Sequence, residues 1–181
     1  MSKERLHPDV VLRHFSPNTS DRTAPLSLIV LHSTESKNVP KSATDLAGVA
    51  DWFGQETSQV SAHVITDADG HSARCVPDRL KAWACAAFNS PSLNIEQIGA
   101  AAQPKWERAE WMETARWIAY WSHSYGIPIR VGEVSGESVT RAGVVTHKML
   151  GVAGGGHVDP GRAYPLEKVL DEARRIKAKR F

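Results

Sequence analysis

The amino-acid sequence predicts an α/β fold, a single domain in which helices flank a central mixed β-sheet. The first indication is that short apolar runs of strand length occur at 27–32 and 142–147. The second is that helical patterns lie between them, over 42–56 and 106–125. The third is size, because 181 residues, 41% of them hydrophobic, suffice for one core and are few for two.

The chain begins with a segment, residues 1–26, that we expect to be an irregular lead-in. Its stretch SPNTSDRTAP at 16–25 is polar and rich in turn formers. The domain proper is predicted to span 27–181 and to begin with the buried strand at 27–32. His32 lies at the carboxyl end of that strand, where α/β sheets gather their ligand sites.

The middle of the chain predicts four units after the first strand. The amphipathic helix at 42–56 comes first. Two strand-like runs within 61–77 then flank an Asp-Gly turn signal, as in a β-hairpin. A further short strand is expected at 92–100, followed by the long helix at 106–125, which Gly126 should end.

The C-terminal third predicts strands at 127–131 and 142–147 and a terminal helix entered through Pro165. Its closing EARRIKAKRF is locally basic, which we interpret as the solvated face of that helix. The net charge is only +2, so the chain lacks the strong positive electrostatic potential that would indicate nucleic-acid binding. We therefore expect no nucleic-acid partner.

Targeting signals and cysteines indicate where the protein is made and whether its thiols are reduced. The sequence contains no run of 18 apolar residues, and MSKERLHPDVVLRHF lacks the apolar region of a secretory signal. We therefore expect synthesis in the cytoplasm without a signal peptide, no stable membrane association, and a monomer. Cys75 and Cys85 are too few for a disulfide framework and fit reduced, buried thiols, although one bridge between them stays open.

A group of polar residues near the C-terminus carries the chemistry. The segment VVTHKMLGVAGGGHVDPG places His147, His157 and Asp159 close together, joined by glycines that let the chain double back. With His32, two imidazoles and one carboxylate form the ligand set of a catalytic zinc, which keeps a fourth position open. A polar surface loop is the alternative for each residue taken alone.

The sequence resembles the zinc-dependent N-acetylmuramoyl-L-alanine amidases of type 2, whose fold is shared with peptidoglycan recognition proteins and many phage endolysins. The resemblance spans about residues 27–172 and rests on four segments in the family's order. These are IVLHST, VSAHVITDADG, AWACAAFNSPSLNIE and VVTHKML with HVDPG.

The resemblance implies a role for each matching residue. His32, His147 and Asp159 would bind one Zn²⁺ per chain, and Glu96 would act as general base on the zinc-activated water. His157 would stabilise the negative charge of the tetrahedral intermediate.

Three further residues are expected to line the groove that holds the substrate. These substrate-binding candidates are Trp83, Asn89 and Thr34.

The chain also departs from the family pattern. Ala62 replaces a tyrosine that some members carry, which puts more weight on Glu96, and Ala84 replaces the histidine of a Trp-His pair. His63 is expected to be structural.

The implied function is hydrolysis of the amide between N-acetylmuramic acid and L-alanine in peptidoglycan, the expected partner, by a phage endolysin that reaches the cell wall through a membrane pore. The alternatives are a cytoplasmic muropeptide-recycling amidase and a non-catalytic peptidoglycan-binding module, which often lacks the third ligand. A metal-free hydrolase with Cys85 as nucleophile is disfavoured, because no base lies beside that residue in KAWACAAFN.

Overall fold

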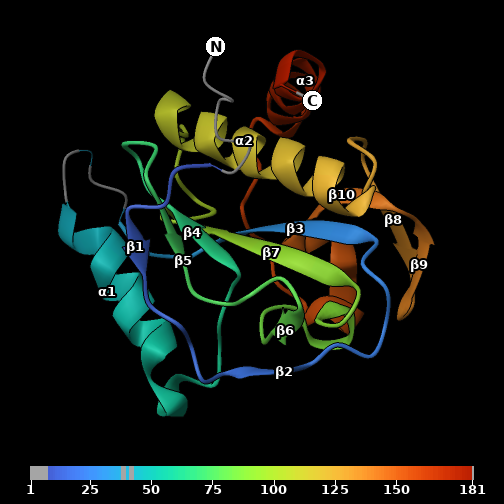
Figure 1. Ribbon diagram of the computed structural model, residues 1–181, viewed down its shortest axis with the longest axis horizontal. Coiled ribbons are helices and arrows are strands. Elements are labelled where there is room, and N and C mark those ends of the chain that lie inside the picture. The colour runs from blue at the N-terminus through green and yellow to red at the C-terminus, as the bar shows by residue number, and fades with distance from the viewer. Residues whose placement is uncertain (1–7, 38–39, 41–42, 181) are drawn as a thin grey trace.

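The computed structural model describes residues 8–37, 40 and 43–180 of the chain. Its strands occur in groups of one to three that helices separate along the sequence (Figure 1). The elements are β1 Leu12–Arg13, β2 Thr19–Asp21, β3 Leu28–Ser33, α1 Ala43–Gly54, η1 Glu56–Ser58, β4 Val64–Thr66, β5 Ser72–Arg74, β6 Leu80–Ala82, η2 Ala86–Phe88, β7 Ser92–Gln97, α2 Arg108–Tyr125, β8 Glu133–Ser135, β9 Ser138–Arg141, β10 Gly143–Thr146, η3 His147–Gly154 and α3 Leu166–Arg180.

Six strands form the central sheet, in the order β1-β5-β4-β7-β3-β10. The pairs of β3 with β7, β3 with β10 and β4 with β7 are parallel, whereas β4 and β5 form the predicted antiparallel hairpin. The predicted α/β class with a central mixed sheet is therefore confirmed. Because β3, β7 and β10 run in the same direction, their carboxyl ends meet at one edge of the sheet.

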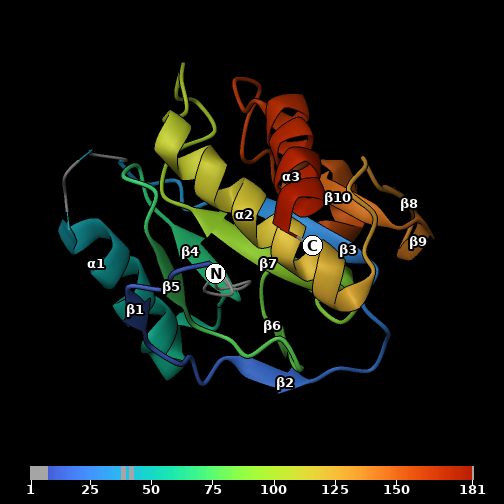
Figure 2. The same cartoon turned by 45° about the horizontal axis from the view of Figure 1, so that its top comes forward.

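The two faces of the sheet are covered by different elements. Figure 2 shows α2 and α3 on one face of the sheet, and Ile29 and Leu31 belong to the core cluster that contains residues of both helices. Leu28 and Val30 point to the opposite face, where they contact η2 and η3. Since side chains alternate along a strand, His32 lies on this second face, away from the two long helices.

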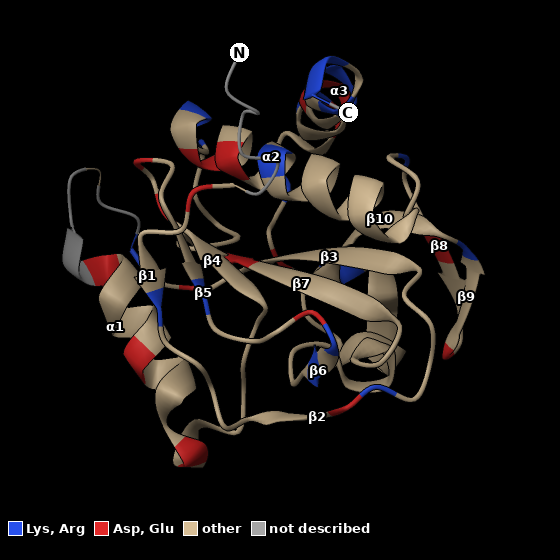
Figure 3. Cartoon of the chain, viewed as in Figure 1, with Lys and Arg blue, Asp and Glu red and all other residues tan. Residues whose placement is uncertain are grey.

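The long helices have the boundaries that their sequence signals predict. Gly126 ends α2 with φ 71°, a left-handed conformation that favours glycine. Trp117 and Trp121 of α2 are fully buried against the sheet. Basic residues predominate on α3 (Figure 3), and Arg174 and Arg175 pair with acidic side chains one turn before them. The terminal helix thus has the solvated charged face that the sequence predicts.

Residues 8–26 differ from the irregular lead-in expected for this segment. They contribute β1, which pairs with β5, and β2, which pairs with β6. The Arg22 guanidinium fixes them by donating hydrogen bonds to the backbone carbonyls of Ser92 (2.9 Å) and Leu80 (2.6 Å). These two short strands exist because of contacts with distant segments, which local sequence patterns do not report.

The strand predicted at 127–131 is the second difference. Only Val131 forms a bridge, to Val144 of β10. Pro128 has no N–H to donate, and the Arg130 N–H turns back to the Pro128 carbonyl at 3.0 Å, so the segment cannot form a continuous ladder. The short strands β6, β8 and β9 were not predicted.

Two further expectations concern membranes and thiols. Within the described residues, every helix is too short or too polar to cross a lipid bilayer. Cys75 and Cys85 are free and buried, as predicted for reduced thiols, so no bridge joins them. Burial raises the pKa of the Cys85 thiol to about 12, which argues against the metal-free nucleophile.

Candidate metal centre

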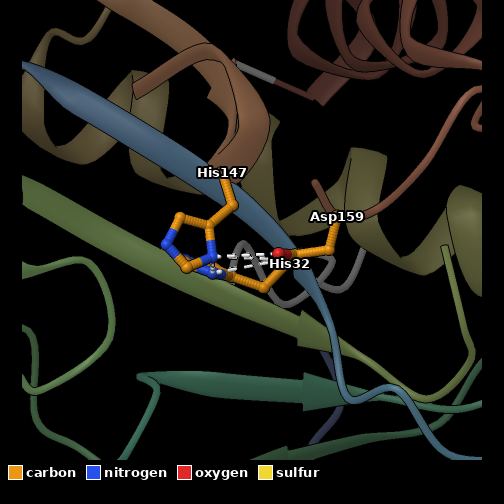
Figure 4. Close-up of side chains that lie close together, drawn as sticks. All are labelled: His32, His147 and Asp159. Atoms are coloured by element: carbon orange, nitrogen blue, oxygen red, sulfur yellow. Dashed lines mark hydrogen bonds and ion pairs between the residues drawn. The ribbon is translucent and has the colours of Figure 1, made fainter. Parts of the chain in front are cut away.

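The structure brings together His32, His147 and Asp159, three residues that are far apart in sequence. His32 is the second-last residue of β3, His147 directly follows β10, and Asp159 comes from the loop before α3 (Figure 4). The two Nδ1 atoms lie 3.0 Å apart, and His147 Nδ1 lies 3.1 Å from Asp159 Oδ1. All three side chains are almost completely buried. One potential ligand atom from each residue can thus face a common point.

Hydrogen bonds to neighbouring groups fix how each ligand candidate is turned. Nε2 of His32 faces Asn94 Oδ1 at 2.9 Å, and Nε2 of His147 faces the Gly154 carbonyl at 2.8 Å. Since both partners are acceptors, the proton of each neutral imidazole is on Nε2 and the lone pair is on Nδ1. The Ser33 N–H donates to Asp159 Oδ2 at 3.1 Å, which orients the carboxylate in the same way.

This arrangement fits a zinc ion. With both protons on Nε2, two lone pairs and a carboxylate oxygen converge without a hydrogen-bond donor between them, an arrangement that a cation stabilises. Ligands about 2.0 Å from a tetrahedral zinc are about 3.3 Å from one another. The distances from His32 Nδ1 to His147 Nδ1 and to Asp159 Oδ2 are 3.0 and 3.7 Å, which bracket that value. Imidazole nitrogen and carboxylate oxygen are also donors that zinc prefers.

The pKa shifts agree with this interpretation. Burial, and then the neighbouring His147, lower the pKa of His32 to about 3, so its imidazole is neutral at physiological pH. Burial alone would raise the pKa of Asp159, but the close approach of His147 and His32, together with the Ser33 N–H, brings it below its usual value. The site therefore combines a neutral His32 imidazole with an ionised Asp159 carboxylate, the forms of these two groups that bind a metal.

The glycine-rich segment returns the chain to the site, as the sequence predicted. Gly155 has φ 109°, and a Cβ on it would lie 3.0 Å from the His157 ring. The turn allows the His157 ring to stack on that of His147, with centroids 4.4 Å apart and planes at 19°. The imidazole of His157 is 61% exposed, so it covers His147 on the solvent side.

Glu96 lies next to the ligand cluster. It is paired with His32 in the register of β7 and β3, so the two side chains leave neighbouring strands on the same face. Burial raises the pKa of Glu96 well above its usual value, and the charges of Asp159 and Glu35 raise it further. A carboxyl group with a raised pKa beside a metal site has the properties of a general acid or base.

A cleft of about 490 Å³ lies over the three ligand candidates and Glu96. Trp83 and Thr34, two of the predicted substrate-binding residues, line it, and so does His157. Asn89 is not among the lining residues. Its side-chain oxygen accepts the N–H groups of Ala84 (2.9 Å) and Cys85 (2.6 Å), so Asn89 holds the loop that carries Trp83.

Three features of the site were missed from the sequence. Asn94 orients His32, Glu35 lies in the cleft, and α1 forms one of its walls with Trp52. The signal for Asn94 was available, because Ser92, Asn94 and Glu96 alternate with apolar residues and must share one face of β7. The contribution of α1 depends on tertiary packing and has no local signal.

His63 has the structural role that was expected. It is fully buried, its Nδ1 accepts the Asn94 N–H at 3.0 Å, and its Nε2 donates to the Leu80 carbonyl at 3.1 Å. Burial lowers its pKa to about 3. The residue thus joins β4, β7 and β6 and does not reach the metal site.

Comparisons with known proteins place this fold and site in context. The family model described as N-acetylmuramoyl-L-alanine amidase matches residues 22–162. No curated protein matches the sequence significantly. Among solved structures, the hydrolase AmiA of Staphylococcus aureus, in complex with its ligand, is 17% identical with a TM-score of 0.72, over 96% of this chain and 86% of that chain.

Two further solved structures have the same fold. The Ph2119 endolysin, from bacteriophage Ph2119 of Thermus scotoductus MAT2119, is 18% identical with a TM-score of 0.60, over 90% of this chain and 97% of that chain. Peptidoglycan recognition protein-LE, in complex with tracheal cytotoxin, is 14% identical with a TM-score of 0.63, over 84% of each chain. The family match includes all three ligand candidates and Glu96, and it confirms the resemblance inferred from sequence: the chain belongs to the N-acetylmuramoyl-L-alanine amidase family.

Proposed function

We propose that this member of the family is a zinc-dependent endolysin that hydrolyses the amide between N-acetylmuramic acid and L-alanine in peptidoglycan. The observation that carries the proposal is the convergence of His32 Nδ1, His147 Nδ1 and the Asp159 carboxylate beside Glu96 in one cleft. The proposed catalytic domain is 27–181, and the strands in 8–26 complete its fold. It acts as a monomer with one zinc ion.

Zinc and Glu96 have separate roles in the proposed reaction. Zinc, when bound, supplies Lewis acidity to the scissile carbonyl and to the attacking water. Glu96 accepts the proton of that water and transfers it to the leaving amine of L-alanine. Its raised pKa brings the carboxyl group closer to the pH at which it both accepts and releases a proton readily.

His157 and the walls of the cleft act on the substrate. The exposed His157 ring donates a hydrogen bond to the carbonyl oxygen as negative charge develops there. Its stacking on His147 keeps it beside the reacting centre. Trp83 and Thr34 contact the muramyl peptide, and Asn89 acts on the substrate only through the loop that it holds.

The endolysin role is proposed because endolysins are among the solved structures with this fold, and product analysis separates it from a recycling enzyme. The Ph2119 endolysin matches this chain over nearly the whole length of both. Release through a membrane pore would bring the protein to the cell wall. A peptidoglycan-binding module without activity is the second alternative, and the presence of Asp159 with Glu96 favours an enzyme.

Product analysis distinguishes these functions. Purified peptidoglycan treated with the protein should yield free stem peptides that begin with L-alanine, detected by mass spectrometry. Binding without product would make the chain a recognition module. Turnover of soluble muropeptides with intact cell walls left undigested would make it a recycling enzyme.

Metal analysis tests the site separately. The purified protein should contain about one zinc ion per chain, and His147→Ala should lose it. His157→Ala should keep the zinc and lower the rate. Loss of zinc from His157→Ala would mean that His157 is a ligand, and full activity without any metal would exclude the proposed chemistry.

A further inference from the structure

The charge of the cleft is unusual for a site that binds a substrate rich in carboxylates. Among the described residues, those that line it include no lysine or arginine. Its walls are otherwise apolar or neutral, with Trp52 and Val60 on the side of α1 and η1. Apart from Asp159, the carboxylates that line it are Glu96 and Glu35. The lining therefore offers carboxylates that a positively charged group on the substrate could approach.

Glu35 is the cleft carboxylate that the proposed reaction does not use. It lies three residues beyond His32 and two residues after the end of β3, and it is exposed to solvent. Its backbone has φ 55°, a left-handed conformation that is uncommon for a residue other than glycine. The side chain is nevertheless held in place, because Oε1 accepts hydrogen bonds from the Ser33 hydroxyl at 2.7 Å and from the Ala101 N–H at 3.0 Å.

These two bonds leave the carboxylate partly available. Both end on Oε1, so they leave the lone pairs of Oε2 available. The charge of Glu35 is close enough to Glu96 to contribute to the raised pKa of that residue. Glu35 therefore presents a fixed negative charge near the reacting centre, without a lysine or arginine among the described lining residues to neutralise it.

We infer that Glu35 determines specificity by binding a primary ammonium group on the peptide of the substrate. This inference rests on the proposed function and adds to it the class of peptide, one that carries a free amine such as a lysine side chain. A prearranged carboxylate binds an ammonium with little further loss of side-chain freedom. Acetylation of that amine should remove the attraction.

The test compares two synthetic substrates that differ only in this charge. Both are N-acetylmuramoyl peptides that contain lysine, with the side-chain amine free in one and acetylated in the other. The wild-type protein should hydrolyse the free-amine substrate with a kcat/KM about fivefold higher, the upper range for an exposed ion pair. The preference should fall toward one in about 1 M salt.

Two variants of Glu35 assign the preference to its charge. Glu35→Gln keeps an oxygen that accepts the bonds from Ser33 and Ala101 but removes the charge, so the ratio of the two kcat/KM values should fall to about one. Glu35→Lys should reverse the preference. Glu137→Gln removes the same charge from the exposed β8–β9 hairpin and should keep the wild-type ratio.

Two results would overturn the inference while leaving the amidase function intact. One is equal hydrolysis of both substrates by the wild-type protein, and the other is a wild-type ratio in Glu35→Gln. If neither substrate is hydrolysed, the proposed function fails instead. Calorimetric binding of the same two peptides to wild type and Glu35→Gln then decides the role of Glu35, since the amine should still strengthen binding only in the wild type.

Discussion

Replacing Asn94 tests whether a residue outside the ligand set controls the metal site. Asn94 is fully buried on β7, and its Oδ1 accepts the Nε2 proton of His32 at 2.9 Å. Its own amide nitrogen donates to Ser92 Oγ at 3.0 Å, which fixes the orientation of the side chain. Asn94→Leu keeps much of the volume and removes the acceptor.

The expected loss of zinc affinity follows from the position of the proton on the His32 imidazole. Without an acceptor at Nε2, that N–H is buried and unpaired, at a cost of about 1–3 kcal/mol. The imidazole can avoid this cost by moving the proton to Nδ1, where Asp159 Oδ2 is 3.7 Å away, but Nδ1 then cannot bind a metal. Either outcome weakens zinc binding, by roughly 10- to 100-fold.

Zinc affinity measured by competition with a chelator gives the result directly. Asn94→Leu should bind zinc 10- to 100-fold more weakly than the wild type, with an unchanged circular dichroism spectrum. Asn94→Asp supplies a carboxylate acceptor at the same place and should restore most of the affinity. The reasoning is refuted if folded Asn94→Leu binds zinc within twofold of the wild type.

The remaining predictions concern catalysis and stability. Glu96→Ala should retain zinc and lose about 10²–10⁴-fold in kcat, measured by peptide release, because general acid-base catalysis contributes this much; lysis near the wild-type rate would contradict its role. Arg22→Leu should lower the free energy of unfolding by roughly 2 kcal/mol in urea titrations, because buried carbonyls of Ser92 and Leu80 lose a charged donor; an unchanged midpoint would mean that the N-terminal strands do not depend on it. His63 binds a proton in the unfolded chain below about pH 6.5, whereas burial lowers its pKa in the folded protein to about 3. Stability is therefore complete above pH 6.5 and should fall by about 1.4 kcal/mol per pH unit from this residue as the pH decreases toward 3. Urea titrations of His63→Gln between pH 7 and 5 should show a shallower dependence than the wild type, and equal slopes would exclude the assignment.

The parts of the fold that the sequence predicted have strong local signals. The apolar run before His32, the Asp-Gly turn between β4 and β5, and the glycine that ends α2 are each determined within a few residues. The same holds for the three ligand candidates, since each lies at a strand end or in a loop shaped by glycine. Parallel pairing of β3 with β10 then brings these segments together.

The features that were not predicted depend on distant partners. The strands in 8–26 are two and three residues long, and the Arg22 guanidinium ties them to carbonyls more than 50 residues away. Asn89 was expected in the cleft because of its place in a family segment. Its side chain instead accepts hydrogen bonds from two nearby backbone N–H groups. These local hydrogen bonds compete with a place in the cleft, and amino-acid composition does not reveal them.

The separation of the ligands has a consequence for how the protein matures. His32 and His147 are 115 residues apart, and Asp159 lies further along the chain. No fragment that ends before Asp159 can assemble the complete set of ligand candidates, so binding of the proposed ion would require synthesis of the chain through Asp159. An ion held there would connect the first core strand to the final loop, closing a long loop late in folding.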